Sequence, residues 1–458
     1  MLNNFKYYIL LVIGFAVIQG CTDIPTGNNT NQSPDTHLSL FPDSTISPGK
    51  TRLTITWWGD DPDGLVAGYN ISFDSLNWTF TTRNDSTFQL AINGNDSTFR
   101  FWVAAVDDKG LVDPTPASNL YPVVNSPPSV KFNTGTEITD TSFPVAAFSW
   151  TGTDPDGDNT IRNYYWSLND TVNWHEISST TTSFLLRQSD GIVPGSNNKL
   201  YLKAKDVAGI YSPIVKMPDS NKTWFVRPVT GHILIIDDYP ASILDNSAAA
   251  AFYQNALDSG SFSQHSSLDI KTSSNANLPR IKSMFTETMK LFQCVIWYAG
   301  RGNNTLIDNA DFDLAQQTVP FYLAAGGKIF FTTGFPNDIT SQGNIVDFAP
   351  IDSMTSYQVT TITSQEPVIV LDNSYPQLET GSVSPDRVRG IRYRAGSYPI
   401  YQMNFHPPYD TTKIYICIKN SQLNPNIVFM SVPIHRMDGL GNAKYFLRRV
   451  LGTDFGIN

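Results

Sequence analysis

The stretch at residues 57–64, WWGDDPDG, decides the fold because it occurs again at residues 150–157 as WTGTDPDG. Two further pairs of segments match in the same order, namely 69–78 with 165–174 and 105–110 with 204–209. Self-similarity at a fixed spacing is the signature of a repeated structural unit. We therefore predict two copies of one module, at residues 38–124 and 125–228, separated by Pro127 and Pro128, which cannot continue a strand ladder.

Each copy has the pattern of short half-buried strands. Leu53, Ile55 and Trp57 alternate with Thr54 and Thr56, a period of two that predicts a strand with one buried face. Asp-Pro-Asp-Gly and Asp-Lys-Gly sequences between such runs supply turns. About seven short strands in a module of roughly this size indicate a β-sandwich.

The early tryptophan and the late A-x-D-x-x-G strand end resemble fibronectin type III or related immunoglobulin-like modules. This resemblance implies two all-β sandwiches in tandem. Neither copy contains a cysteine pair that could bridge its sheets, which excludes antibody-type domains.

The aspartates of the repeated turn allow two interpretations. Clustered carboxylates suit Ca²⁺, and the candidates are Asp61, Asp63, Asp154, Asp156 and Asp158. An EF-hand is excluded, because aligning the turn glycine with the invariant glycine of that loop leaves no acid at the first position and no glutamate at the twelfth. The choice is between a looser calcium site and plain tight turns with solvated aspartates.

The module tryptophans also allow two interpretations. Their rings could form a stacking platform for sugars or fill the sheets and the core. The residues concerned are Trp78, Trp102, Trp166 and Trp174.

The N-terminus has the layout of an export signal. Lys6 precedes an apolar run at residues 7–18, which is too short to span a bilayer. The run ends in Ile18-Gln19-Gly20-Cys21, which resembles the lipobox of bacterial lipoproteins; the alternative is an ordinary signal peptide. The resemblance implies removal of residues 1–20, a membrane anchor on lipidated Cys21, and an exported protein of the cell envelope. Thr22 after the cysteine favours the outer membrane, without deciding the leaflet.

Residues 21–37 are polar and read as a flexible tether. The net charge of the chain is −10. This excludes a non-specific nucleic-acid binder, which needs a basic surface to release counterions. Three cysteines cannot build a disulfide framework or a structural zinc site.

The sequence at residues 230–458 changes to alternating strands and helices. Continuous apolar runs such as 233–236, 294–299 and 328–331 predict strands buried on both faces. Helical spacing at 247–257 and 311–325 predicts helices between them. This order predicts a doubly wound α/β domain with a mostly parallel sheet.

The α/β segments at residues 232–238, 294–300 and 324–334 resemble the class I glutamine amidotransferase-like, flavodoxin-like fold. That family carries a nucleophilic cysteine on an elbow after a central strand. The matching segment here is 332–336, TTGFP, which has neither cysteine nor serine. Cys294 and Cys417 lie inside apolar strands and are expected to be structural. The resemblance therefore implies a degenerate domain, a pseudoenzyme without the family's catalysis.

Candidate site residues follow the predicted strands, where this architecture places its ligands. The acid–base or metal-ligating candidates are Asp237, Asp238, His406 and His435, and the ligand-binding candidates are Gly300, Arg301, Gly302 and Thr333. Asp237 and Asp238 could instead cap the helix that follows. Gly300 to Gly302 could cradle an anion or form a plain strand-to-helix loop.

Three functions remain open from the sequence. The first is a non-catalytic binding or scaffold lipoprotein, in which the sandwiches are spacers that present the α/β domain to a protein or glycan partner. The second is an extracytoplasmic hydrolase with its site in residues 230–458. The third is a glycan-binding protein that uses the sandwich aromatics. No cofactor is expected other than Ca²⁺ at the turn aspartates.

Overall fold

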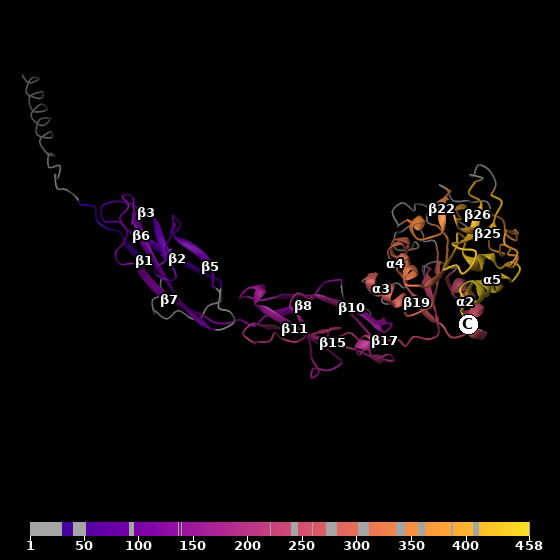
Figure 1. Cartoon of the computed structure of the whole chain (residues 1–458), viewed down its shortest axis with the longest axis horizontal. Coiled ribbons are helices and arrows are strands. Elements are labelled where there is room, and N and C mark those ends of the chain that lie inside the picture. The colour runs from indigo at the N-terminus through magenta and orange to yellow at the C-terminus, as the bar shows by residue number, and fades with distance from the viewer. Residues whose placement is uncertain are drawn as a thin grey trace, which may run out of the picture. The chain divides into compact units, whose positions relative to one another are not determined.

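The computed structural model describes fourteen stretches of the chain (Figure 1), namely residues 30–39, 52–90, 96–135, 137–138, 140–219, 221–239, 246–258, 260–271, 282–300, 311–335, 344–355, 362–385, 388–405 and 412–457. They form two compact units, of which one is built around the first sandwich and the other holds the second sandwich together with the α/β domain. No helix among the described residues is long and apolar enough to cross a membrane.

The first module is an antiparallel β-sandwich, as predicted. One sheet has the order β1-β2-β5 and the other β4-β3-β6-β7. The strands are β1 Asp35–Leu38, β2 Arg52–Asp60, β3 Val66–Ser72, β4 Thr79–Thr81, β5 Asp85–Gln89, β6 Ser97–Asp107 and β7 Ala117–Val123. Trp57 of β2 is fully buried and lies 5.4 Å, between ring centroids, from Phe101 of β6, so the two sheets share one core.

The first strand begins earlier than the sequence suggested. Asp35, Thr36 and His37 belong to β1, although we assigned them to the tether. Thr36 is buried, and its hydroxyl accepts a hydrogen bond of 2.7 Å from the backbone N–H of Ala105. The polar sequence showed no sign of this strand, because the buried position is held by a hydrogen bond to the Thr36 hydroxyl and not by an apolar side chain.

The second module repeats the plan of the first. Its sheets have the orders β13-β10-β8 and β12-β11-β15-β16, and a small third sheet has the order β14-β17-β9. Trp150 of β10 takes the place of Trp57 and packs edge-on against Tyr164 of β11. The strands are β8 Ser129–Phe132, β9 Thr141–Ser142, β10 Val145–Thr153, β11 Ile161–Leu168, β12 His175–Ser178, β13 Ser183–Arg187, β14 Ser196–Asn197, β15 Leu200–Asp206, β16 Val215–Met217 and β17 Phe225–Val226.

The C-terminal domain is built on a mixed sheet that is parallel only in its first half. Strands β19-β18-β20-β21-β27 are parallel neighbours, whereas β26, β24 and β22 continue the sheet antiparallel and β25 and β23 branch from it. The strands are β18 Ile233–Asp238, β19 Ser266–Asp269, β20 Cys294–Ala299, β21 Lys328–Thr333, β22 Ile351–Met354, β23 Ile369–Val370, β24 Ile391–Tyr393, β25 Tyr398–Gln402, β26 Tyr415–Lys419 and β27 Ile427–Met430.

A mostly parallel sheet was therefore too simple an expectation. A parallel pair requires a long crossover, usually a helix, whereas antiparallel strands can be joined by short connections. The described part of residues 344–430 contains no α-helix between its strands, which fits antiparallel pairing.

The helices pack against two opposite faces of the sheet. Along β18, Ile233 and Ile235 belong to one apolar cluster, and Leu234 and Ile236 to another. The first cluster includes residues of α2 Asn246–Leu257 and α5 Ala443–Arg449, and the second includes residues of α3 Lys282–Met289 and α4 Phe312–Ala324. Alternation of side chains along a strand explains why neighbouring residues enter different clusters.

The second sandwich and the α/β domain share a packed contact. Phe143, beside β9, enters the apolar cluster of α3 and α4 and meets Phe292 edge-on, with 5.2 Å between ring centroids. In return, Met284 of α3 enters the core of the sandwich. A 2.8 Å ion pair between Arg187 and Glu287 lies at the same contact. The second module thus packs directly against the α/β domain.

Candidate functional site

The described candidate residues of the α/β domain follow the carboxyl ends of its parallel strands. Asp238, the last residue of β18, is completely buried. Its Oδ2 accepts hydrogen bonds from the Trp297 indole N–H at 3.0 Å and from the backbone N–H of Asp311 at 2.8 Å. The Lys271 ammonium lies 3.3 Å from Oδ1.

These contacts make Asp238 a structural tie between several elements. It joins the end of β18 to β20, to the segment after β19 and to the start of α4, where the Asp311 side chain caps the helix by accepting from Leu314 N–H. Burial raises the pKa of Asp238 to about 7, and the Lys271 ammonium opposes part of that rise. The Asp238 carboxylate thus holds the backbone N–H of the residue that caps α4.

Asp237 is less enclosed than Asp238 and faces the other side of the sheet. Its Oδ1 accepts the backbone N–H of Tyr239 at 2.9 Å, and the Tyr298 hydroxyl donates to its carboxylate. Burial raises the pKa of Asp237 to about 6, with a smaller contribution from the Asp269 carboxylate on the neighbouring strand. A carboxyl group that titrates near neutral pH can act as an acid or a base.

An aromatic layer lies between Asp237 and His435. Tyr239 contacts the His435 ring edge-on, with 5.6 Å between centroids, and Tyr253 of α2 stacks on Tyr298 at 4.2 Å. Gly300 is required by this layer, because a Cβ at that position would lie 2.6 Å from the Tyr239 ring. Gly300 is therefore needed for close packing, and its predicted part in an anion cradle with Arg301 and Gly302 stays a prediction.

A pocket of about 540 Å³ opens beside this layer. It lies between α2, the segment 381–383, the 3₁₀ helix η5 Ile434–Met437 and the start of α5. Its polar lining consists of Asn255, Ser382, His435, Arg436, Asp438 and Lys444. Of these, the sequence singled out only His435. The others are polar residues of common types with no local pattern that would have marked them.

The elbow segment carries no exposed nucleophile in its described part. Thr333 is fully buried, and its hydroxyl donates to the carbonyl of Gly334 at 2.5 Å. Burial raises the pKa of the Cys294 and Cys417 thiols, as expected for structural cysteines. Thr333 is accordingly a core residue in this structure and does not line the pocket.

Several candidates lie outside the described residues. They are the lipidation residue Cys21, the loop residues Arg301 and Gly302, and His406. The predicted leader and most of the tether are also outside this part of the chain.

The repeated aspartates order their own turns. Asp61 Oδ1 accepts the backbone N–H of Asp63 at 3.2 Å, and Asp154 Oδ1 accepts that of Asp156 at 2.9 Å. Asp158 Oδ1 accepts the N–H of Asp154 at 3.0 Å. Within the described stretches, no three acidic, histidine or cysteine side chains come together in a way that could hold a metal ion. The turn interpretation accounts for these contacts, and calcium binding stays untested.

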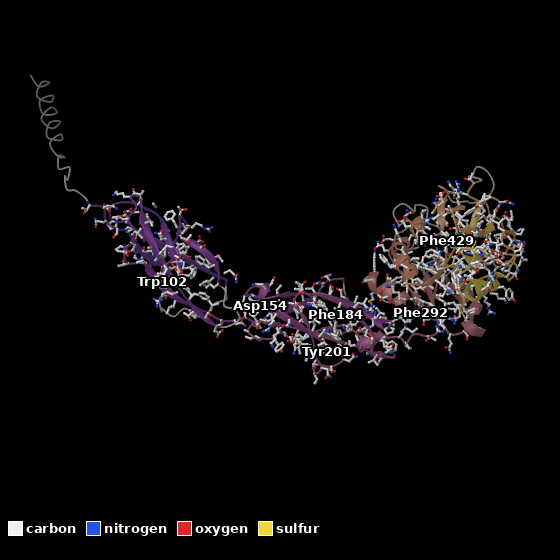
Figure 2. All side chains as sticks on the ribbon, viewed as in Figure 1. Trp102, Asp154, Phe184, Tyr201, Phe292 and Phe429 are labelled. Atoms are coloured by element: carbon white, nitrogen blue, oxygen red, sulfur yellow. The ribbon has the colours of Figure 1, made fainter. Side chains whose placement is uncertain are left out.

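The candidate tryptophans are engaged by neighbouring side chains and backbone groups. Trp166 stacks on His175 at 4.3 Å, and the Lys203 ammonium lies 4.0 Å from the Trp174 ring centroid. Trp78, through its N–H, donates to the carbonyl of Ser75. The Arg100 guanidinium lies 5.7 Å from the ring of Trp102, which Figure 2 labels. The His175 and Lys203 contacts cover ring surface of Trp166 and Trp174 that a sugar platform would need to expose, whereas Trp78 is 38% exposed.

Parts of this chain are similar in structure to β-domains of other proteins. No protein-family model and no curated protein matches the chain. Among solved structures, it is similar to fibronectin(III)-like modules of CbhA from Clostridium thermocellum (13% identity, 42% of this chain and 94% of that chain, TM-score 0.19). It is similar to a two-domain fibronectin type III segment of chicken tenascin (18% identity, 40% and 97%, TM-score 0.22).

The PKD1 domain of Vibrio anguillarum Epp is a third similar structure (15% identity, 20% of this chain and 96% of that chain, TM-score 0.16). At such TM-scores the likeness carries no argument about function. The two sandwich modules are established by the strand pairing and shared cores described above.

Proposed function

We propose that this protein is an envelope-anchored lipoprotein that acts as a non-catalytic binding or scaffold protein. Cys21 would carry the lipid anchor, in the outer membrane, and the polar segment after it would be the tether. The sandwiches, which we propose to be fibronectin III or immunoglobulin-like modules, would present the α/β domain. The partner is a ligand or protein bound by that domain.

The α/β domain is proposed to be a degenerate relative of the class I glutamine amidotransferase-like, doubly wound fold. Parallel strands with helices on both faces support this proposal. The observation that carries the binding role is that this domain has a pocket separate from its fully buried acid, Asp238. Asp238 is committed to Lys271, Trp297 and Asp311, whereas the pocket, which Asp238 does not line, opens beside α2 and the start of α5.

The anchoring part is tested by labelling growing cells with an alkyne-bearing fatty acid. The wild-type chain should incorporate the label and sediment with membranes, whereas Cys21→Ala should do neither. Equal labelling of both chains, or of neither, would contradict anchoring through Cys21.

The binding part is tested by thermal melting of the purified full chain against sugars, nucleotides, peptides and small organic acids. A compound that binds only the folded state raises the midpoint by linkage, and this rise should occur without conversion of the compound. Turnover of a compound that raises the midpoint would refute the non-catalytic role.

A hydrolase is the second candidate, favoured by Asp237. Its raised pKa of about 6 suits proton transfer near neutral pH, and Tyr239 links it to His435. Asp237→Asn keeps the size and one acceptor oxygen but cannot ionise. If a hydrolytic activity of the purified chain is found, this variant should abolish it. Unchanged turnover would remove Asp237 from the chemistry.

A further inference from the structure

We propose that the pocket between α2, the segment 381–383 and η5 binds a small organic molecule that carries an oxyanion group, either a carboxylate or a phosphate. The inference rests on the proposed binding role of the α/β domain and names the chemical class of its ligand. The volume of about 540 Å³ is in the usual range for small-molecule sites.

The charge of the lining identifies the class of ligand. Arg436 and Lys444 are cationic, and the polar ring of His435 lies beside them in the lining. Among the described lining residues, Asp438 is the only acid, and its Oδ1 already accepts the backbone N–H of Ala443 at 2.9 Å. A cationic concavity on a chain of net charge −10 concentrates anions locally.

The backbone and one ring of the basic wall are held in place. The Arg436 carbonyl accepts the backbone N–H of Gly381 at 2.8 Å, which joins η5 to the opposite segment. The His435 ring rests against Tyr239. A guanidinium on this wall can hold two oxygens of one carboxylate or phosphate at once. Fixed walls also lower the entropic cost of ordering the site on binding.

The remaining wall fits an apolar part of the ligand. Along α2 the pocket is lined by Ala248, Ala251, Ala256 and Phe252. The three alanines leave room because their side chains are short, and Phe252 offers a half-buried ring. An oxyanion attached to a ring or a short aliphatic chain would use both walls, whereas inorganic phosphate would use only the basic one.

Isothermal titration of the purified full chain tests this proposal. The probes are phenyl phosphate and benzoate, with benzyl alcohol as the neutral ring and inorganic phosphate as the bare anion. We expect phenyl phosphate or benzoate to bind saturably, inorganic phosphate to bind more weakly, and benzyl alcohol not to bind. Failure of both ring-bearing anions, or equal binding of benzyl alcohol, would overturn the proposal.

Variants locate the site. Lys444→Gln, at an exposed position, and Arg436→Gln should each weaken binding about tenfold, since each removes a charge-assisted interaction. Lys131→Gln and Arg162→Gln, on exposed positions of the second sandwich, remove the same charges and should leave binding unchanged. Asp438→Asn keeps an acceptor for Ala443 and should tighten binding.

The outcomes separate this inference from the proposed function. Anion binding that Lys444→Gln and the control variants reduce equally would be general electrostatics, and would overturn the pocket assignment. A panel in which only neutral compounds raise the melting midpoint would overturn the ligand class but keep the binding role. Circular dichroism melts of each variant separate lost binding from lost folding.

Discussion

Replacing Phe143 by alanine should destabilise the second sandwich and the α/β domain together. Phe143 is 3% exposed, meets Phe292 edge-on and has the Arg227 guanidinium 4.4 Å from its ring centroid. Truncating a buried phenylalanine costs about 3–5 kcal/mol. The upper part of that range is expected here, because the aromatic pair and the cation–π contact are lost with the ring.

Hydrogen exchange in a urea series measures the effect in each domain separately. Peptides from β10 report on the sandwich and peptides from β20 on the α/β domain. If the shared contact couples the two, Phe143→Ala should lower the urea midpoint of both sets of peptides. Phe101→Ala is the matched control, since it removes a fully buried ring from the other compact unit and should leave β20 unchanged. Normal protection of β20 beside a weakened β10 would refute the coupling.

Three further predictions concern the carboxyl edge and the core. Because burial raises the pKa of Asp237 to about 6, the folded state binds this proton more tightly than the unfolded chain, and the free energy of unfolding should fall by up to about 3 kcal/mol as the pH rises from 4 to 6. Asp237→Asn should remove that part of the slope in urea titrations, and identical slopes would contradict it. Cys294 and Cys417 should react with a thiol reagent only as fast as the protein unfolds, and rapid reaction in the native state would show that they are accessible. Gly300→Ala should cost about 1–3 kcal/mol in chemical denaturation through its clash with Tyr239, and a variant as stable as wild type would refute that close contact.

The sequence predicted best where one local signal determines the structure. The repeated turn and the alternating strand around Trp57 were sufficient for a sandwich, and the apolar run at β18 for a buried strand. It missed β19, Ser266–Asp269, because its polar letters SSLD do not show the period of a strand. It also missed the contact made by Phe143, since a residue that packs across two domains looks like any core aromatic.

The candidate site was predicted only in part, because the sequence shows local signals and not contacts between distant segments. A position after a buried strand was enough to select Asp237, Asp238 and His435. The partners of Asp238 come from distant segments, and Lys271 follows a strand that was not predicted. Arg436 and Lys444 become notable only when η5 and α5 are seen to face one pocket.

The most direct test of the central claim combines melting and turnover on three forms of the full chain: wild type, Asp237→Asn and Lys444→Gln. At a hundredfold excess over its dissociation constant, a bound ligand stabilises the fold by about 2.7 kcal/mol. The account predicts that phenyl phosphate or benzoate raises the melting midpoint of wild type and Asp237→Asn, raises that of Lys444→Gln far less, and is recovered unchanged. A midpoint shift insensitive to Lys444 would contradict the assigned pocket, and conversion of the compound that depends on Asp237 would contradict a non-catalytic domain and establish an enzyme.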